Sequence, residues 1–257
     1  MAKYLTEFIG TFFLVLTIGL VVCQGATVVG FLAPLAIGCS LMIMVYMGGH
    51  VSGGHYNPAV SLAAMMRGAM SSLDLIPYWI FQVAGSFAAA LVVAVIFGGI
   101  GGPAAVETDT AMNTASAAYV STIAADAEAT PAFFGPAPGA GLSLTSPGPW
   151  LVEILFTFAL ALVVLQTATS TGTANNSFYG LAIGFTVVVA AFAGGGISGG
   201  AFNPAVGIGP NVIKGTLGGE PEVMTNIILH TLGPFIGGAL AAVVFKIQEA
   251  FVIKKAS

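Results

Sequence analysis

Charged residues are scarce in this chain of 257 residues: Asp, Glu, Lys and Arg together make up 6% of it, whereas hydrophobic residues make up 57%. A soluble domain usually carries about a quarter charged residues, because its surface faces water. No charge occurs from Phe8 through Met66, a run of 59 residues, or from Ile154 through Ile213, a run of 60. Since one membrane-crossing helix takes roughly 20 apolar residues, each run can hold two. The scarcity of charge argues against a soluble domain and predicts a multi-pass helical membrane protein.

Other chemical groups are also sparse. The two cysteines, Cys23 and Cys39, both lie in apolar runs, which excludes a disulfide framework and a metal-ligand spacing. The net charge of −4 gives no reason to expect a nucleic-acid partner. No nucleophile–base set or metal-binding set is present, so we expect no enzyme activity and no cofactor. Lys3 precedes an apolar stretch without a small-residue cleavage pattern, which predicts a retained first helix and not a signal peptide.

Hydropathy divides the chain into six apolar spans and two shorter helical pieces. The spans are expected at about 4–23, 32–49, 75–98, 149–167, 178–195 and 226–247. The shorter pieces, 58–67 and 204–213, cannot cross a bilayer. Each follows a glycine-rich turn and an Asn-Pro pair, which favours a helix start with Asn as the N-cap and Pro in the first turn. Residues 99–148 are rich in Ala, Gly, Pro, Ser and Thr, and we expect an aqueous loop there.

The two halves of the chain match. Ser52-Gly53-Gly54-His55-Tyr56-Asn57-Pro58-Ala59-Val60 recurs as Ser198-Gly199-Gly200-Ala201-Phe202-Asn203-Pro204-Ala205-Val206, an offset of 146 residues. Glu7 and Glu153 keep the same offset, and later the register becomes 152, with Gly85 matching Gly237. We therefore divide one channel-like domain, 1–257, into a first repeat of about 1–98, the loop 99–148 and a second repeat of about 149–248.

Three spans per repeat make the two repeats oppositely oriented, and inverted repeats of this kind place their functional site near the bilayer midplane. The basic residues set the orientation, because cytoplasmic loops are enriched in Lys and Arg. With both termini in the cytoplasm, Lys214 alone of the six basic residues lies outside. The loop 99–148 is then external.

The chemistry of a pore follows from the two breaks in the spans. Non-helical backbone at membrane depth is tolerated only where protein or a water-filled cavity satisfies it, and 50–56 and 196–202 are expected to be such backbone. The half-helices begin at Asn57 and Asn203, so their positive ends point at each other. Each Asn is expected to cap its helix with its side-chain oxygen and to leave its amide free to donate to water. This arrangement interrupts the chain of hydrogen-bonded water that would conduct protons, and it raises the barrier for cations.

The doubled Asn-Pro-Ala box, the opening Glu7-Phe8-Ile9-Gly10-Thr11-Phe12 and the segment Gln82-Val83-Ala84-Gly85 resemble the aquaporin (major intrinsic protein) family. The resemblance covers nearly the whole chain outside 99–148. It implies an all-α membrane protein with six transmembrane helices and two re-entrant half-helices, a homotetramer in a lipid bilayer, and one pore per subunit. The boxes are Asn57, Pro58, Ala59, Asn203, Pro204 and Ala205. The pore-loop residues are His50, Gly53, Gly54, His55, Gly196 and Gly199.

Two kinds of residue remain open to two interpretations. Glu7 and Glu153 are carboxylates inside spans, where a functional role is the default; without a nearby His, Lys or second acid, support of the pore loops is favoured over a proton relay, and it matches the family. His50 and His55 are either buried histidines bonded to backbone or pore residues. In the second case, protonation of His50 at the cytoplasmic side alters passage.

One position departs from the family pattern. Most members place an arginine after the second box, where this chain has Val206. The resemblance places the other constriction positions at Ile37, Ala191 and Gly200, so the filter lacks charge, aromatic rings and side-chain hydrogen-bond donors. A wide, apolar constriction is expected, unless a residue of 99–148 moves in and restores a narrow polar filter.

The sequence thus predicts a passive channel for water and small neutral solutes such as urea, ammonia, glycerol or hydrogen peroxide. The alternatives are a strict water channel and a junction protein of low permeability. A secondary transporter needs coupling residues at the midplane, which are absent from the sequence. The cell membrane is the expected location.

Overall fold

The computed structural model describes residues 1–23, 28–97, 134–219 and 222–256. Its six long helices are α1 (Ala2–Val22), α3 (Ala33–Ser52), α5 (Ser72–Ile96), α7 (Pro147–Val164), α8 (Tyr179–Ser198) and α10 (Val223–Ala256). The short elements are α2 (Val28–Phe31), η2 (Leu165–Thr169), which is a π-helix that continues α7, and η3 (Thr171–Thr173). Within the described residues there is no strand. The predicted all-α class is confirmed.

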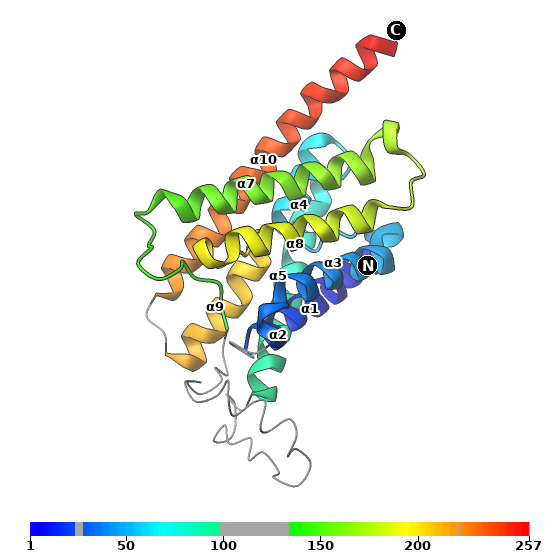
Figure 1. Ribbon diagram of the computed structural model, residues 1–257. Coiled ribbons are helices and arrows are strands. Elements are labelled where there is room, and N and C mark those ends of the chain that lie inside the picture. The colour runs from blue at the N-terminus through cyan, green and yellow to red at the C-terminus, as the bar shows by residue number, and fades with distance from the viewer. Residues whose placement is uncertain (24–27, 98–133, 220–221, 257) are drawn as a thin grey trace.

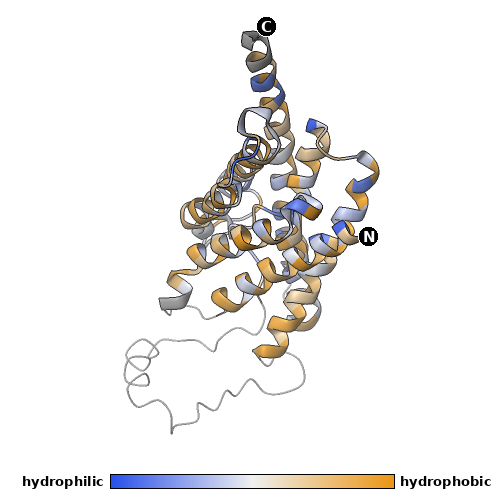
Figure 2. Cartoon of the chain, turned by 90° about the vertical axis from the view of Figure 1, so that its right-hand side faces the viewer, coloured by the Kyte–Doolittle hydropathy of each residue, from blue (hydrophilic) through white to orange (hydrophobic). Residues whose placement is uncertain are grey.

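Within the described part of the chain, six helices are long and apolar enough to cross a membrane. Large apolar side chains are exposed along them, including Ile80, Leu155 and Val189, each more than half exposed. Figure 2 shows the apolar colour spread along the long helices. Apolar surface of this extent is not stable against water. These faces therefore contact lipid or another protein within a bilayer.

The two half-helices are α4 (Pro58–Arg67) and α9 (Pro204–Gly218). Each is capped by an asparagine: the Asn57 Oδ1 accepts from the Ala59 amide at 2.9 Å, and the Asn203 Oδ1 accepts from the Ala205 amide at 2.9 Å. A proline in the first turn leaves no amide there to satisfy. The sequence therefore starts both half-helices in the same way.

The half-helices enter from opposite sides of the molecule (Figure 1). α9 ends close in sequence to the start of α10, whereas Arg67 at the end of α4 lies 3.2 Å from Glu249 near the end of α10. The Arg67 guanidinium also donates to the Thr169 carbonyl at 2.7 Å and lies over the Phe245 ring. These contacts join α4 to both η2 and α10 at the end of the molecule that carries the C-terminus.

Matched helix pairs pack through matched glycines. Gly85 on α5 lies against the Phe8 carbonyl on α1, and Gly237 on α10 lies against the Ile154 carbonyl on α7. A side chain at either glycine would meet backbone that cannot rotate away. The close approach of α1 to α5 and of α7 to α10 therefore depends on the absence of a Cβ.

We expect Gly85→Ala to destabilise the protein by about 1–3 kcal/mol, the usual cost of forcing extra volume into a packed interior. The measurement is the melting temperature of the purified protein in detergent. Gly148→Ala is the matched control, because the nearest atom to its new methyl group would lie at an ordinary 3.8 Å. Equal melting temperatures for the two variants would contradict the packing argument.

Four predicted boundaries need correction, among them the last span, which was predicted at 226–247 and extends as α10 from Val223 to Ala256. α3 continues to Ser52 and α8 to Ser198, so irregular backbone begins at Gly53 and Gly199 and not at His50 and Gly196. Helical bonding continues because backbone groups at membrane depth need partners, as in the bond from the Gly53 amide to the Gly49 carbonyl. α9 runs beyond the predicted 204–213, since Lys214 does not interrupt it. Most of the predicted loop 99–148 lies outside the described residues.

Candidate functional site

The first pore loop, Gly53–Tyr56, is held by a buried carboxylate on α1. Glu7 is fully buried. Its Oε1 accepts from the Ser52 hydroxyl at 2.6 Å and the His55 amide at 3.0 Å. Its Oε2 accepts from the Tyr56 amide at 2.6 Å and the Gln82 side-chain amide at 2.8 Å. Four donors therefore converge on one carboxylate and fix the course of the loop.

The second pore loop, Gly199–Phe202, repeats this arrangement on α7. Glu153 is also fully buried. It accepts from the Ser198 hydroxyl at 2.7 Å, the Ala201 amide at 3.0 Å and the Phe202 amide at 2.8 Å. Both predicted carboxylates thus contact the irregular backbone of their own repeat.

Both loops contain left-handed residues at matched positions. Gly53 and Gly54 have φ of 90° and 64°, and Gly199 and Gly200 have 91° and 65°. Each loop then has a bulky residue in the same region: Tyr56 at 49° and Phe202 at 48°. A non-glycine residue with positive φ is strained and persists only where its surroundings fix it. Here the bonds to the buried carboxylates fix it, and the strain recurs in both repeats.

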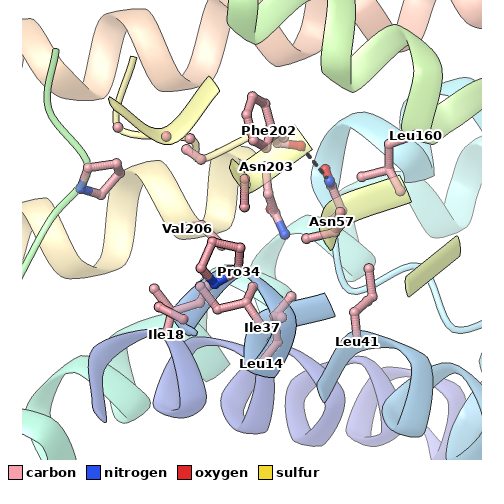
Figure 3. Close-up of a pocket in the computed structure, with 18 of the residues that line it drawn as sticks. Leu14, Ile18, Pro34, Ile37, Leu41, Asn57, Leu160, Phe202, Asn203 and Val206 are labelled. Atoms are coloured by element: carbon pink, nitrogen blue, oxygen red, sulfur yellow. Dashed lines mark hydrogen bonds between the residues drawn. The ribbon is translucent and has the colours of Figure 1, made fainter. Parts of the chain in front are cut away.

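The two loops meet through their asparagines. The Asn57 Nδ2 donates to the Phe202 carbonyl at 2.9 Å, and the Asn203 Nδ2 donates to the Tyr56 carbonyl at 2.9 Å. Figure 3 shows the two side chains facing each other beside the cavity. The expectation of a free amide therefore needs refinement: one hydrogen of each NH₂ bonds to the opposite loop, and the other is left to point into the cavity.

A cavity of about 480 Å³ brings together all four predicted constriction residues. Ile37, Ala191, Gly200 and Val206 line it together with Asn57 and Asn203, so the predicted filter and the asparagine pair belong to one passage. Around the labelled part of this cavity, Figure 3 shows Ile37 and Val206 on facing sides, with further hydrocarbon from Leu14, Ile18 and Leu41.

A segment of the connecting loop also lines this cavity: Phe134, Gly135, Pro136 and Ala137. The Asn211 Nδ2 on α9 donates to the Pro136 carbonyl at 3.1 Å and to the Gly207 carbonyl at 2.9 Å. The Gly139 amide donates to the Ile197 carbonyl at 3.0 Å. Described loop residues therefore do reach the cavity, but the side chains of these four are apolar and none of the four supplies the missing positive charge.

The opposite mouth is a second cavity of about 610 Å³ with a more polar lining. His50 and His55 both line it, and His55 also lines the first cavity. The His55 Nδ1 lies 3.1 Å from the Ser61 hydroxyl. His50 is exposed in the last turn of α3. His55 thus lies where the two cavities approach each other, and His50 lies farther out.

Comparison with known proteins identifies the fold and the chain's relatives. The family model described as Major intrinsic protein matches residues 1–245. The chain belongs to this family. It is 31% identical to Glycerol uptake facilitator protein-like 6 of Lactiplantibacillus plantarum, over 94% of this chain and 95% of that protein. It is also 31% identical to Aquaporin Z of Brucella melitensis, over 95% and 96%.

A third relative, Aquaporin TIP1-1 of Arabidopsis thaliana, is 31% identical over 84% of this chain and 70% of its own length. Among solved structures, the aquaglyceroporin from Plasmodium falciparum superimposes with a TM-score of 0.74 at 18% identity, and the match covers 95% of this chain and 94% of that one. This likeness confirms the fold.

As a major intrinsic protein, the chain is a multi-pass integral membrane protein and a passive channel for water and small solutes. It is not an enzyme, because members of this family are channels. The predicted resemblance and the channel class are therefore confirmed, which removes the secondary transporter from consideration.

Sequence reasoning missed several residues that build the pore of this major intrinsic protein. Ser52 and Ser198 could have been found, because both lie in the matched segments and each is 45 residues from the carboxylate that it bonds. Tyr56 and Phe202 also match, but nothing in the sequence indicated that the carbonyl of each accepts a hydrogen bond from the asparagine of the other repeat. Asn211 gave no signal, since its partner Pro136 is distant in the chain.

Proposed function

We propose that this channel conducts small neutral solutes wider than water, together with water, and that it excludes ions and protons at Asn57 and Asn203. The observation that supports the proposal is that the four residues predicted to form the constriction, Ile37, Ala191, Gly200 and Val206, all line one cavity. These side chains offer no hydrogen bond to a passing solute. Passage is then governed by size and by the free-energy cost of dehydration.

Urea, ammonia, glycerol and hydrogen peroxide are the candidate solutes. Glycerol gains support from the name of the Lactiplantibacillus relative, which is a glycerol uptake facilitator protein-like chain. The loop segment 134–137 adds apolar atoms and backbone to the lining of the cavity, which disfavours charged solutes further. The alternatives are strict water conduction and a low-permeability junction role.

Reconstitution into proteoliposomes tests the proposal. Inward gradients of urea, glycerol or hydrogen peroxide are expected to cause faster swelling than in empty liposomes, without saturation or ion dependence. Rapid water flux with no solute flux would establish the strict water channel. Assembled protein that conducts neither water nor solute would support the junction role.

Val206→Arg is expected to lower the flux of glycerol and urea several-fold more than the flux of water. The long cationic side chain would fill part of the passage and bind water by hydrogen bonds. The measurement is the ratio of solute to water permeability in matched proteoliposomes. The control is Val206→Leu, which adds volume without charge. Val189→Arg is not suitable as a control, because it puts a charge on an exposed apolar face. Equal losses of water and solute flux in Val206→Arg would show that Val206 does not line the narrowest point.

We further propose that the protein assembles as a homotetramer in the cell membrane with both termini in the cytoplasm. Lys3 and Asp74 form an ion pair at 2.7 Å, and Arg67 pairs with Glu249 at the end that carries the C-terminus. This placement of basic residues agrees with a cytoplasmic face. Protease protection of a C-terminal tag in sealed vesicles tests the orientation.

A further inference from the structure

The second pore loop is supported by a histidine where the first is supported by a tyrosine. The Tyr78 hydroxyl on α5 donates to the Ser52 carbonyl at 2.7 Å. The His230 Nε2 on α10 lies 2.6 Å from the Ser198 carbonyl oxygen. Tyr78 and His230 are 152 residues apart, the register of Gly85 and Gly237, while Ser52 and Ser198 keep the offset of 146. The two side chains therefore occupy equivalent places in the inverted repeat.

Both ring nitrogens of His230 face atoms that can only accept a hydrogen bond. The Nδ1 lies 2.7 Å from the Asn226 carbonyl oxygen, and the Nε2 has the Ser198 carbonyl. A neutral imidazole carries one N–H, so one nitrogen would direct a lone pair at a carbonyl oxygen. An imidazolium carries two N–H groups and donates both. His230 is fully buried, so water does not compensate a mismatched lone pair.

The carboxylate of Glu153 supplies the matching negative charge. Its Oε1 lies 3.8 Å from the His230 Nε2, and both side chains are fully buried. Glu7 has a fourth donor in Gln82, but the residue that matches Gln82 at the offset of 152 is Pro234, which has no side-chain donor. Glu153 therefore has three donors and a neighbouring imidazole where Glu7 has four neutral donors.

No other charged group faces this pair within the described part of the helices around it. α10 packs against α7, α9, α4 and η2, whose described charged residues are Glu153, Lys214 and Arg67. Arg67 bonds to Glu249 far along α10. Gly207 on α9 lies beside His230, and Lys214 is seven residues farther on, about 10 Å along the helix.

We propose that His230 is a positioning residue that remains a doubly protonated imidazolium, which balances the charge of Glu153 and holds the Ser198 carbonyl at the start of the second pore loop. Glu153 holds the loop through its amides, and His230 holds it through a carbonyl. The first repeat does the same work with uncharged donors. The inference concerns the support of the loop and holds whichever solutes pass.

The protonation state is tested by nitrogen NMR of histidine-labelled channel in lipid. At about pH 8, a histidine with the ordinary pKa of ~6.5 is almost entirely neutral. The chain has three histidines, and we expect one of them to show two protonated ring nitrogens. This signal should vanish in His230→Tyr. Three neutral histidines, or a doubly protonated signal that persists in the variant, would overturn the proposal.

The positioning role is tested by comparing His230→Phe with His230→Tyr. Phenylalanine removes the donor to Ser198, and tyrosine restores a hydroxyl, as at Tyr78. We expect water permeability per folded channel to fall several-fold in the Phe variant and to recover largely in the Tyr variant. Wild-type permeability of a folded Phe variant would overturn the role. If neither variant folds, a wild-type spectrum with three neutral histidines still overturns the charged state of His230.

Discussion

Glu7→Leu is expected to yield no folded, conducting channel. The substitution removes the acceptor of two loop amides, those of His55 and Tyr56. It also removes the nearer of two acceptors of the Ser52 hydroxyl and of the Gln82 side-chain amide. Each buried donor left without a partner costs about 1–3 kcal/mol. The sum approaches the roughly 5–15 kcal/mol by which a folded domain is stable. The measurements are the recovery of monodisperse protein in detergent, its melting temperature, and water flux in proteoliposomes.

Two further variants make the result specific. Glu7→Gln keeps the shape and one acceptor oxygen but turns an NH₂ group toward other donors, so an intermediate melting temperature is expected. Glu249→Gln also neutralises a carboxylate, but that group is partly exposed and has a single surface partner, Arg67. It should cost at most about 1 kcal/mol. A melting temperature of Glu7→Leu equal to that of Glu249→Gln would contradict the role of Glu7 in holding the loop.

Asn203→Asp is expected to make the channel leak protons and cations. The carboxylate still caps α9 but cannot donate to the Tyr56 carbonyl, and it places a negative charge where the positive ends of α4 and α9 meet. The barrier to a cation falls there. A lowering of about 1.4 kcal/mol raises a rate tenfold, and we expect a leak at least this large, together with slower water flux.

The leak is measured with a pH-sensitive dye trapped in proteoliposomes. Asn57→Asp should give a similar leak, because the two asparagines bond reciprocally across the centre. Asn175→Asp adds the same charge in an exposed turn that lines the second cavity, so it should leak no more than the wild type. A leak of equal size in Asn175→Asp would place the exclusion of cations elsewhere than at the two asparagines.

Much of the architecture could be predicted because membranes impose simple rules on sequence. Two long uncharged runs required four spans, and the repeated Ser-Gly-Gly and Asn-Pro-Ala segments indicated two interrupted helices. Helix ends were less certain. The glycines at 48–49 and 194–196 would weaken a helix in water, but at membrane depth the backbone keeps its helical hydrogen bonds. α3 and α8 therefore continue through these glycines.

Contacts between repeats could not be predicted in the same way. Asn211 and Pro136 are 75 residues apart, and no local pattern pairs an amide on a half-helix with a loop carbonyl. His230 was missed because a single histidine in an apolar span has no visible partner in the sequence. Its role follows from the equivalence with Tyr78, which becomes evident only when the two side chains are seen on equivalent carbonyls, those of Ser52 and Ser198.

The reciprocal bonds between the two pore loops also constrain how the chain is made. Asn57 is 145 residues before its partner Phe202, and Tyr56 is 147 before Asn203. During synthesis the first re-entrant loop emerges long before the groups that complete it, with a carbonyl and an amide still unpaired. The first loop therefore forms its final hydrogen bonds only after the second loop has entered the membrane. Completion of the pore structure is thus a late event in biogenesis.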